Sequence, residues 1–215
     1  MNSGLFITFE GTEGSGKTTH IHRLTEDLTK AGHRVKKTRE PGGTDIGDQI
    51  RTILLDVNNS QLSSTAELML YAASRAQHVG QKIIPALKTG AIVVSDRFAD
   101  ASVAYQGYGQ GVELDELSRM GNLAAGAAMP DLTLILDLPV DDGFARTERR
   151  SDDVSRYEQM DRAMHERMRQ GFLSIAQAMS ARCRLIDATL DSDSVHQAVW
   201  HSVQERFKIE AKQND

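Results

Sequence analysis

The feature that most constrains this chain is a glycine-rich turn near its N-terminus. The turn follows Leu5–Phe9, an apolar, β-branched run typical of a strand buried on both faces of a parallel sheet. Its sequence is Gly11-Thr12-Glu13-Gly14-Ser15-Gly16-Lys17-Thr18, which matches the pattern G-x-x-x-x-G-K-[ST] at every position. A helical pattern begins at Thr18 and continues to Leu28. The order of strand, glycine-rich loop and helix predicts a phosphate-binding loop, or P-loop.

The residue types in this loop suit a nucleoside triphosphate. Glycines let the backbone approach a phosphate closely, because a Cβ atom would collide with it. The free N–H groups and the dipole of the helix start attract anions. Lys17 supplies a charge for the β- and γ-phosphate oxygens, and the Thr18 hydroxyl suits a Mg²⁺ ion.

The amino-acid composition limits the classes of protein to which this chain can belong. The chain has 215 residues, 40% of them hydrophobic and 26% charged, which predicts one globular domain over 1–215. No apolar run approaches the ~18 residues needed to cross a membrane, and no export signal is recognisable. The single cysteine, Cys183, excludes an internal disulfide and suits a reducing compartment. A net charge of −5 argues against a nucleic-acid partner. We therefore expect a cytoplasmic protein that binds neither membrane nor nucleic acid.

The rest of the chain alternates apolar strand patterns with helical ones. Further strands are predicted at residues 34–38, 91–95, 132–138 and 184–187. Helices are predicted at 45–55, from Ser63 or Ser64 to 78, at 112–125, 141–150, 160–181 and 192–208. We expect Glu67 to form a capping box with Ser64, and Gly80 and Pro85 to interrupt the helix that passes through residue 78. This alternation predicts an α/β fold with a doubly wound, five-stranded parallel sheet.

Polar residues at the carboxyl ends of the strands are candidates for the site, since open α/β sheets bind ligands there. Arg39 follows the second strand as a candidate phosphate ligand; the alternative is a solvated pair with Glu40. Asp96 ends a buried strand, where it can hold Mg²⁺ or alternatively cap the next helix, and Arg97 follows it. Tyr71 and Arg75 are four residues apart on one helix and can clamp a flat ring, or they are a buried tyrosine beside a surface arginine.

One missing motif and two groups of basic residues indicate the class of reaction. The Asn-Lys-x-Asp motif of GTPases is absent. A small kinase needs a second anion site, for which the chain offers Arg39, Arg75 and Arg97, and a basic lid that neutralises the transferring phosphoryl group. Residues 146–156 have the composition of such a lid; the alternative is the solvated end of a basic helix.

Six motifs together resemble the bacterial thymidylate kinases, which are P-loop nucleoside monophosphate kinases. Their order and spacing fit that family over most of the chain, and Arg-Glu-Pro-Gly-Gly and Ala-Tyr-Gln-Gly are specific to it. The motifs are Phe9 to Thr19, Thr38 to Thr44, Tyr71 with Arg75-Ala76-Gln77-His78, Asp96-Arg97-Phe98, Ala104-Tyr105-Gln106-Gly107 and Pro130-Asp131-Leu132-Thr133.

The resemblance implies transfer of the γ-phosphoryl group of ATP to dTMP, giving dTDP and ADP, with Mg²⁺ as cofactor and a homodimer as assembly. ATP would be held by Gly11, Thr12, Glu13, Gly14, Ser15, Gly16, Lys17, Thr18 and Thr19, with Asp187, Ala188 and Thr189 near the adenine. The metal would lie near Thr18, Asp96 and Glu10. The implied dTMP ligands are Arg39, Pro41 and Arg97 around the phosphate, Tyr71, Arg75 and Ser102 around the base, and Tyr105, Gln106 and Glu13 around the sugar and pocket wall. Tyr71 stands where the family more often has Phe.

The catalytic cations implied by the resemblance are Lys17, Arg97 and one of Arg149, Arg150 and Arg156. Some family members carry an Arg inside the P-loop, whereas Thr12 to Ser15 supply none here, so the extra cation is expected from a lid at about 146–157. Arg149 is the first candidate. The family commonly has an Asp before the last of these arginines, and this chain has Ser155. Two alternatives stay open: a kinase for another monophosphate such as dCMP or AMP, and an ATP-binding regulatory module without turnover.

Overall fold

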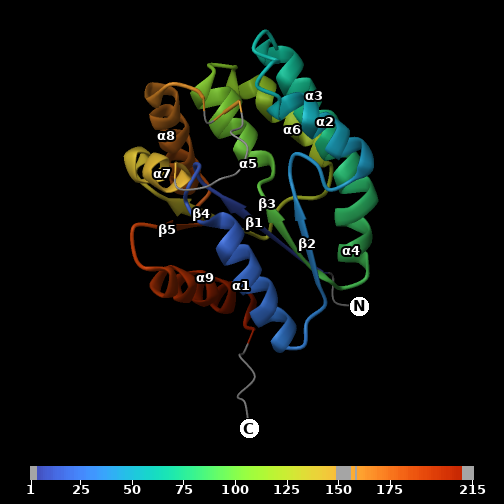
Figure 1. The fold of residues 1–215 in the computed structure, drawn as a ribbon. Helices are drawn as coiled ribbons and strands as arrows, with labels where there is room; N and C mark the ends of the chain where they lie inside the picture. Colours follow the sequence, from blue (N-terminus) through green and yellow to red (C-terminus); the bar gives the residue numbers. More distant parts are fainter. Residues whose placement is uncertain (1–3, 149–155, 158, 210–215) are drawn as a thin grey trace.

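The structure, a computed structural model, describes residues 4–148, 156–157 and 159–209. Within these residues one parallel sheet has five strands in the order β2-β3-β1-β4-β5 (Figure 1). The strands are β1 (Leu5–Glu10), β2 (Val35–Arg39), β3 (Ile92–Asp96), β4 (Leu132–Asp137) and β5 (Cys183–Asp187). The predicted doubly wound, five-stranded parallel sheet is confirmed.

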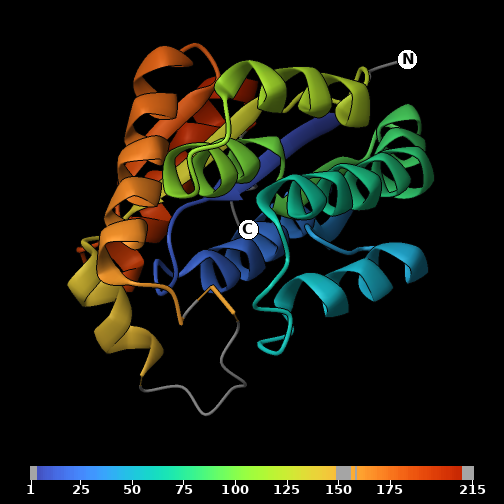
Figure 2. The ribbon, with the colours of Figure 1, turned by 90° about the horizontal axis from the view of Figure 1, so that it is seen from above.

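Helices cover both faces of the sheet. They are α1 (Lys17–Lys30), α2 (Asp45–Leu55), α3 (Ser64–His78), η1 (Val79–Ile83), α4 (Ile84–Lys88), α5 (Ala99–Ser102), η2 (Val103–Gly109), α6 (Leu114–Ala125), α7 (Val140–Thr147), α8 (Arg162–Ala178) and α9 (Ser192–Phe207). Figures 1 and 2 show α1 and α9 together on one face, with α3, α4 and α6 on the other. No helix among the described residues is both long and apolar enough to cross a bilayer.

The period-two alternation of the strands explains this layering. Ile7 and Phe9 of β1 are fully buried in the cluster that includes Leu24 of α1 and Val199 of α9. Phe6, which precedes Ile7 in sequence, faces the opposite cluster. Both sides of the central strand are therefore core, as expected for a continuous apolar run in a parallel sheet.

The predicted interruption after residue 78 is wrong, because the chain stays helical to Lys88. A π-helical stretch, η1, follows α3 directly, and Pro85 then lies in the first turn of α4. Proline lacks an N–H group, so within a continuous helix Pro85 leaves one carbonyl of the preceding turn without its helical hydrogen bond. A π-helical insertion widens the helix and lets the direction change without ending it.

The strand order brings the predicted site residues to one edge. Phe9 of β1 and Arg39 of β2 are both in register with Asp96 at the end of β3. The P-loop leaves β1 at this edge, so three segments distant in sequence meet where ligands bind in open α/β sheets.

Candidate functional site

The P-loop is folded around Lys17. Its ammonium group donates to the carbonyl oxygens of Gly11 at 3.0 Å and Thr12 at 2.8 Å. Burial, with Arg97 nearby, lowers the pKa of Lys17 to about 8. Gly14 has a φ of 74°, and a Cβ there would lie 2.5 Å from the Gly143 carbonyl oxygen. The loop therefore packs directly on α7.

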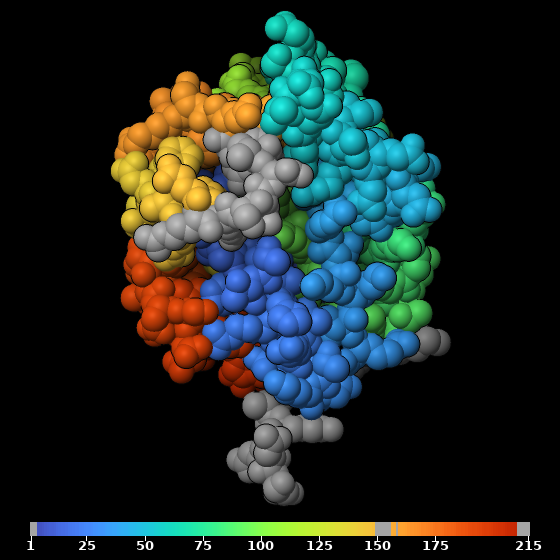
Figure 3. All heavy atoms as spheres, in the orientation of Figure 1, coloured from blue at the N-terminus to red at the C-terminus, as the bar shows by residue number. Residues whose placement is uncertain are grey.

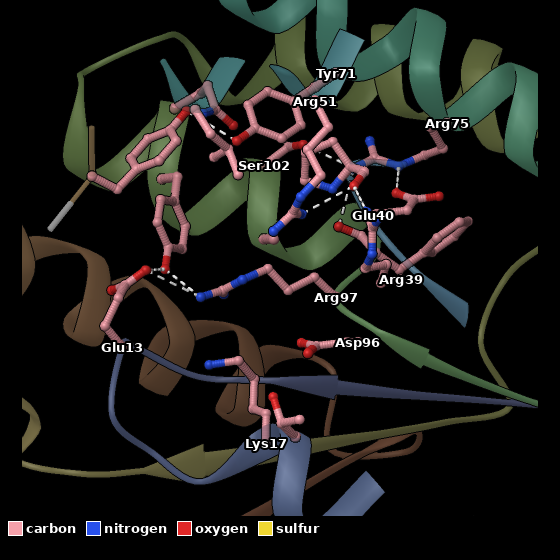
Figure 4. Close-up of a pocket in the computed structure, with 18 of the residues that line it drawn as sticks. Glu13, Lys17, Arg39, Glu40, Arg51, Tyr71, Arg75, Asp96, Arg97 and Ser102 are labelled. Carbon is pink, nitrogen blue, oxygen red and sulfur yellow. Dashed lines mark hydrogen bonds and ion pairs between the residues drawn. The ribbon is translucent and has the colours of Figure 1, made fainter. Parts of the chain in front are cut away.

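A cavity of about 340 Å³ opens beside the loop. In Figure 3, α1, in blue, lies between α7 and α9, in yellow and red, on one side and β2 and α2, in lighter blue, on the other. In Figure 4, Lys17 and Asp96 lie at one side of the cavity and Tyr71 and Arg75 at the other, with Arg97 crossing between them. The lining includes all nine residues predicted for the acceptor: Glu13, Arg39, Pro41, Tyr71, Arg75, Arg97, Ser102, Tyr105 and Gln106.

Arg97 joins the P-loop to the acceptor side. Its φ of 66° lies in the left-handed region, which is uncommon for a residue other than glycine and marks a functional position. Its guanidinium donates to the Gly11 carbonyl at 2.9 Å, to the Tyr105 hydroxyl at 2.6 Å and to Glu13 at 3.2 Å. Burial works against the charge on Glu13, but His165, Arg97 and Lys17 outweigh it and hold the pKa of this carboxyl well below its usual value. Glu13 is therefore an anion that keeps Arg97 over the loop.

Two arginines lie at the β2 end of the cavity. Arg39 pairs with Asp48 at 2.9 Å, not with Glu40, and donates to the Pro41 carbonyl at 3.0 Å. Arg51 of α2 donates to the same carbonyl at 3.1 Å, and burial lowers its pKa. Arg39 is about half exposed, so its guanidinium is accessible to a ligand in the cavity.

Arg75 is buried, which rules out the surface arginine that the sequence left open. It donates to the carboxylate of Glu40 at 2.8 Å, and to the Phe98 carbonyl and the Ser102 hydroxyl at 3.0 Å each. Arg75 and Ser102, predicted to act together, are thus in direct contact at the cavity wall. Glu40 also accepts from His78 and is fully enclosed, so this wall is a fixed polar surface.

Oxygen atoms suited to a metal lie at the base of the cavity. Asp96 and Thr18 line it, and Glu10, at the end of the neighbouring strand β1, has no exposed surface. One oxygen of Glu10 accepts from the Phe98 N–H at 2.8 Å, while the other, Oε2, is buried without a hydrogen-bond partner. Burial raises the pKa of Glu10 to about 8. Hydroxyl and carboxylate oxygens are the ligands that Mg²⁺ prefers, so this donor set fits that ion.

The loop after β5, predicted to border the adenine, connects to the P-loop through Arg146. This guanidinium donates to the Ala188 carbonyl at 3.0 Å and to the Gly14 carbonyl at 3.5 Å. Asp187 accepts from the backbone and hydroxyl of Thr189, which closes the turn. These residues lie outside the acceptor cavity, on the α7 side of the loop.

The structure describes one of the three candidate lid arginines. Arg149 and Arg150 lie outside the described residues. Arg156 is described, and its guanidinium donates to the buried Glu67.

Six residues of the cavity wall were not among the predicted site residues: Glu40, Arg51, Leu55, Phe98, Ala101 and Tyr157. Tyr157 lines the cavity although nothing in its sequence surroundings indicates this. Arg51 had a usable signal, because it stands four residues after Gly47 and three before Leu54, the buried positions of α2. A charged side chain on the buried face of a helix is a candidate ligand.

Comparison with known proteins agrees with this geometry. Residues 9–199 match the family model for thymidylate kinase. The chain is similar to the thymidylate kinase of Geobacter sulfurreducens, 51% identical over 189 residues that cover 86% of this chain and 89% of the relative. It is 45% identical to that of Nitratidesulfovibrio vulgaris over 214 residues, covering 97% of this chain and 100% of the relative. The crystal structure of thymidylate kinase from Ehrlichia chaffeensis superposes with a TM-score of 0.76 at 35% identity, covering 94% of this chain and 99% of the other.

Proposed function

This chain belongs to the thymidylate kinase family and is an enzyme that phosphorylates dTMP to dTDP, and from that premise we propose which of its residues bind each substrate and which act in catalysis. The family uses ATP as phosphoryl donor. The main proposal is that the catalytic Arg comes from the lid at residues 146–157 and not from the P-loop.

We place the triphosphate of ATP on the P-loop. Lys17, now bonded to loop carbonyls, turns its ammonium group to the β- and γ-phosphates. The adenine borders Asp187, Ala188 and Thr189, where Arg146 already joins that turn to the P-loop. Mg²⁺ is placed near Thr18, Asp96 and Glu10, and the Glu10 oxygen that has no hydrogen-bond partner and lies 3.9 Å from the Arg97 guanidinium supports this. When bound, the ion neutralises charge on the phosphate oxygens.

We place dTMP in the cavity with its phosphate toward Arg39 and Arg97. Tyr71 stacks on the thymine, and the Arg75–Ser102 wall meets the polar edge of the base. Tyr105 and Glu13, in contact with each other at the cavity, border the sugar. The attacking atom is a phosphate oxygen that is already ionised at pH 7, so the site needs no general base, and alignment and charge neutralisation supply the catalysis.

An ADP-release assay over dTMP, dUMP, dCMP and AMP tests this placement. We expect the highest kcat/KM for dTMP, because the wall formed by Arg75 and Ser102 suits a pyrimidine with an oxygen at position 4. Equal kcat/KM values for dTMP and dCMP would contradict it.

The observation that carries the lid proposal is the charge of the P-loop. Before Lys17 its one charged residue is Glu13, an acid that pairs with Arg97. Arg97 is held between Glu13 and Tyr105 and faces the acceptor, which leaves the transferring phosphoryl group without an arginine from the loop. Arg149 is the first candidate for that role and Arg150 the next.

Alanine variants at these positions test the proposal. With both substrates saturating, Arg149→Ala should lower kcat by about 10³-fold with little change in either KM, the loss expected of an arginine finger. A loss below about tenfold would move the role to another lid arginine. Losses below tenfold in both Arg149→Ala and Arg150→Ala would overturn the proposal.

We also propose a homodimer formed through α3 and α6. On α3 and η1, Met69, Ala73, Ala76 and Gly80 are exposed at helical spacing, and the last three are small enough for a partner helix to approach closely. On the adjacent α6, Leu123 is 81% exposed, an unusual exposure for a large apolar side chain. A second copy of the chain that covers this surface agrees with the homodimer implied by the family resemblance.

A further inference from the structure

Glu67 of α3 is a fully buried carboxylate on which four side chains converge. Its Oε1 atom accepts from the Gln106 amide, the Gln110 amide and the Tyr157 hydroxyl, each at 2.7 Å. Its Oε2 atom accepts from the guanidinium of Arg156. Three of these four donors meet at Oε1, so the carboxylate is held from several directions without any contact to solvent. The expected capping box is wrong, since Ser63 caps α3 alone and Glu67 points inward.

Two of the four donors connect Glu67 to the proposed base pocket. Gln106 lines the cavity directly. The Tyr157 hydroxyl accepts from the Tyr71 hydroxyl at 3.0 Å while donating to Glu67. Burial raises the pKa of Tyr71 to about 12 and that of Tyr157 well above its usual value, so both hydroxyls keep their protons as donors. The hydrogen bonds therefore run in one direction, from Tyr71 through Tyr157 to Glu67.

Arg156 is held to the same carboxylate by partners on α2 and α3. Besides the ion pair with Glu67, its Nε donates to the Leu54 carbonyl at 3.2 Å and its backbone N–H to the Leu55 carbonyl at 3.3 Å. Its guanidinium also lies 5.0 Å from the centre of the Tyr157 ring. It balances the charge of a carboxylate that has no exposed surface.

We infer that Glu67 is a positioning residue for the dTMP base pocket and that Arg156 is its counter-ion, not a cation for the transferring phosphoryl group. The inference rests on the proposed placement of dTMP, because it assigns Tyr71 and Gln106 to the wall that meets the base. It removes Arg156 from the candidates for the catalytic cation.

A charge-removal cycle separates the two roles of Arg156. Removing one member of a buried ion pair leaves an uncompensated charge, whereas removing both members costs far less. Arg156→Gln and Glu67→Gln should each raise the KM for dTMP about tenfold or more, with kcat falling less than that. The double variant should return to within about threefold of the wild-type KM. A catalytic Arg156 gives the opposite pattern: kcat about 10³-fold lower, dTMP KM unchanged and no rescue by Glu67→Gln.

Smaller changes test the hydrogen-bond chain if the charge variants do not fold. Tyr71→Phe removes one hydrogen bond and should raise the KM for dTMP about fivefold, whereas Tyr157→Phe removes the bonds to both Tyr71 and Glu67 and should raise it at least as much. The double variant should match Tyr157→Phe, since both substitutions break the same chain. Tyr108→Phe is the matched control: Tyr108 lies in η2, does not line the cavity and is not among the donors to Glu67. We expect it to leave this KM unchanged. Additive effects, or an equal effect of Tyr108→Phe, would overturn the inference.

Arg39→Gln distinguishes failure of this inference from failure of the dTMP placement. If dTMP lies as proposed, this variant raises the KM for dTMP whether or not Glu67 positions the base wall. An unchanged KM for dTMP in Arg39→Gln would contradict the proposed placement of dTMP. If Arg39→Gln raises the KM for dTMP and the effects of Tyr71→Phe and Tyr157→Phe are additive, only the positioning role of Glu67 is contradicted.

Discussion

Glu10 should make the enzyme less stable as the pH rises from 4.5 to 8. Its folded pKa is about 8 because burial opposes the charged form, against an ordinary value of 4.5. Between these two values the folded protein keeps a proton that the unfolded chain releases. Stability is therefore fully present below pH 4.5 and is lost as the pH rises through the folded pKa. At about 1.4 kcal/mol per pKa unit, the total loss approaches 5 kcal/mol.

Glu10→Gln removes this titration while keeping the shape of the side chain. The amide oxygen can still accept the Phe98 N–H bond that Glu10 accepts now. We expect the free energy of unfolding of the variant, measured relative to that of the wild type, to increase by about 1 kcal/mol per pH unit between pH 5 and 8. Urea denaturation followed by circular dichroism, without nucleotide or metal, measures this difference.

Glu116→Gln is the matched control, because Glu116 is an exposed residue of α6. Its difference from the wild type should stay constant over the same pH range. A constant difference for Glu10→Gln as well would refute the reasoning, since it would mean that the buried carboxyl does not hold its proton in the folded protein.

Three further predictions concern the nucleotide sites and the assembly. Lys17→Ala should abolish phosphoryl transfer with no loss in melting temperature, because it removes a desolvated charge; unfolding at room temperature would contradict this. Arg51→Gln should raise the KM for dTMP about tenfold and leave the KM for ATP unchanged, as expected for one charge-assisted hydrogen bond on the acceptor side. Leu123→Glu should convert a dimer to a monomer in light scattering, and a wild-type monomer would remove the proposed interface.

The fold was predictable because its signals are local. The three central strands β1, β3 and β4 are short apolar runs, and the glycine-rich loop lies where a strand meets a helix. The carboxyl ends of parallel strands share one edge, so Arg39, Asp96 and Arg97 could be placed together before any contact was known. The helical course through Pro85 was not predictable from the same reasoning, because a π-helical turn leaves no periodic pattern over five residues.

The hydrogen-bond partners of Glu67 could not be predicted from the sequence. Local spacing gave Glu67 a capping role beside Ser64, whereas its partners Gln106 and Tyr157 stand 39 and 90 residues away. Which distant donors reach a buried carboxylate depends on how η2 and the chain before α8 pack against α3. The same holds for Arg75, whose contact with Glu40 spans 35 residues and turns a surface candidate into a buried wall.

The central claim is that a lid arginine acts on the transferring phosphoryl group, and binding of a transition-state mimic tests it most directly. Fluoroaluminate with ADP and Mg²⁺ imitates that group, so titration calorimetry can compare the dTMP dissociation constant with and without it. We expect wild-type enzyme to bind dTMP about 10²-fold more tightly with the mimic. The double variant Arg149→Ala with Arg150→Ala should bind dTMP normally with ADP alone and show no such tightening. Full tightening in the double variant would contradict the claim.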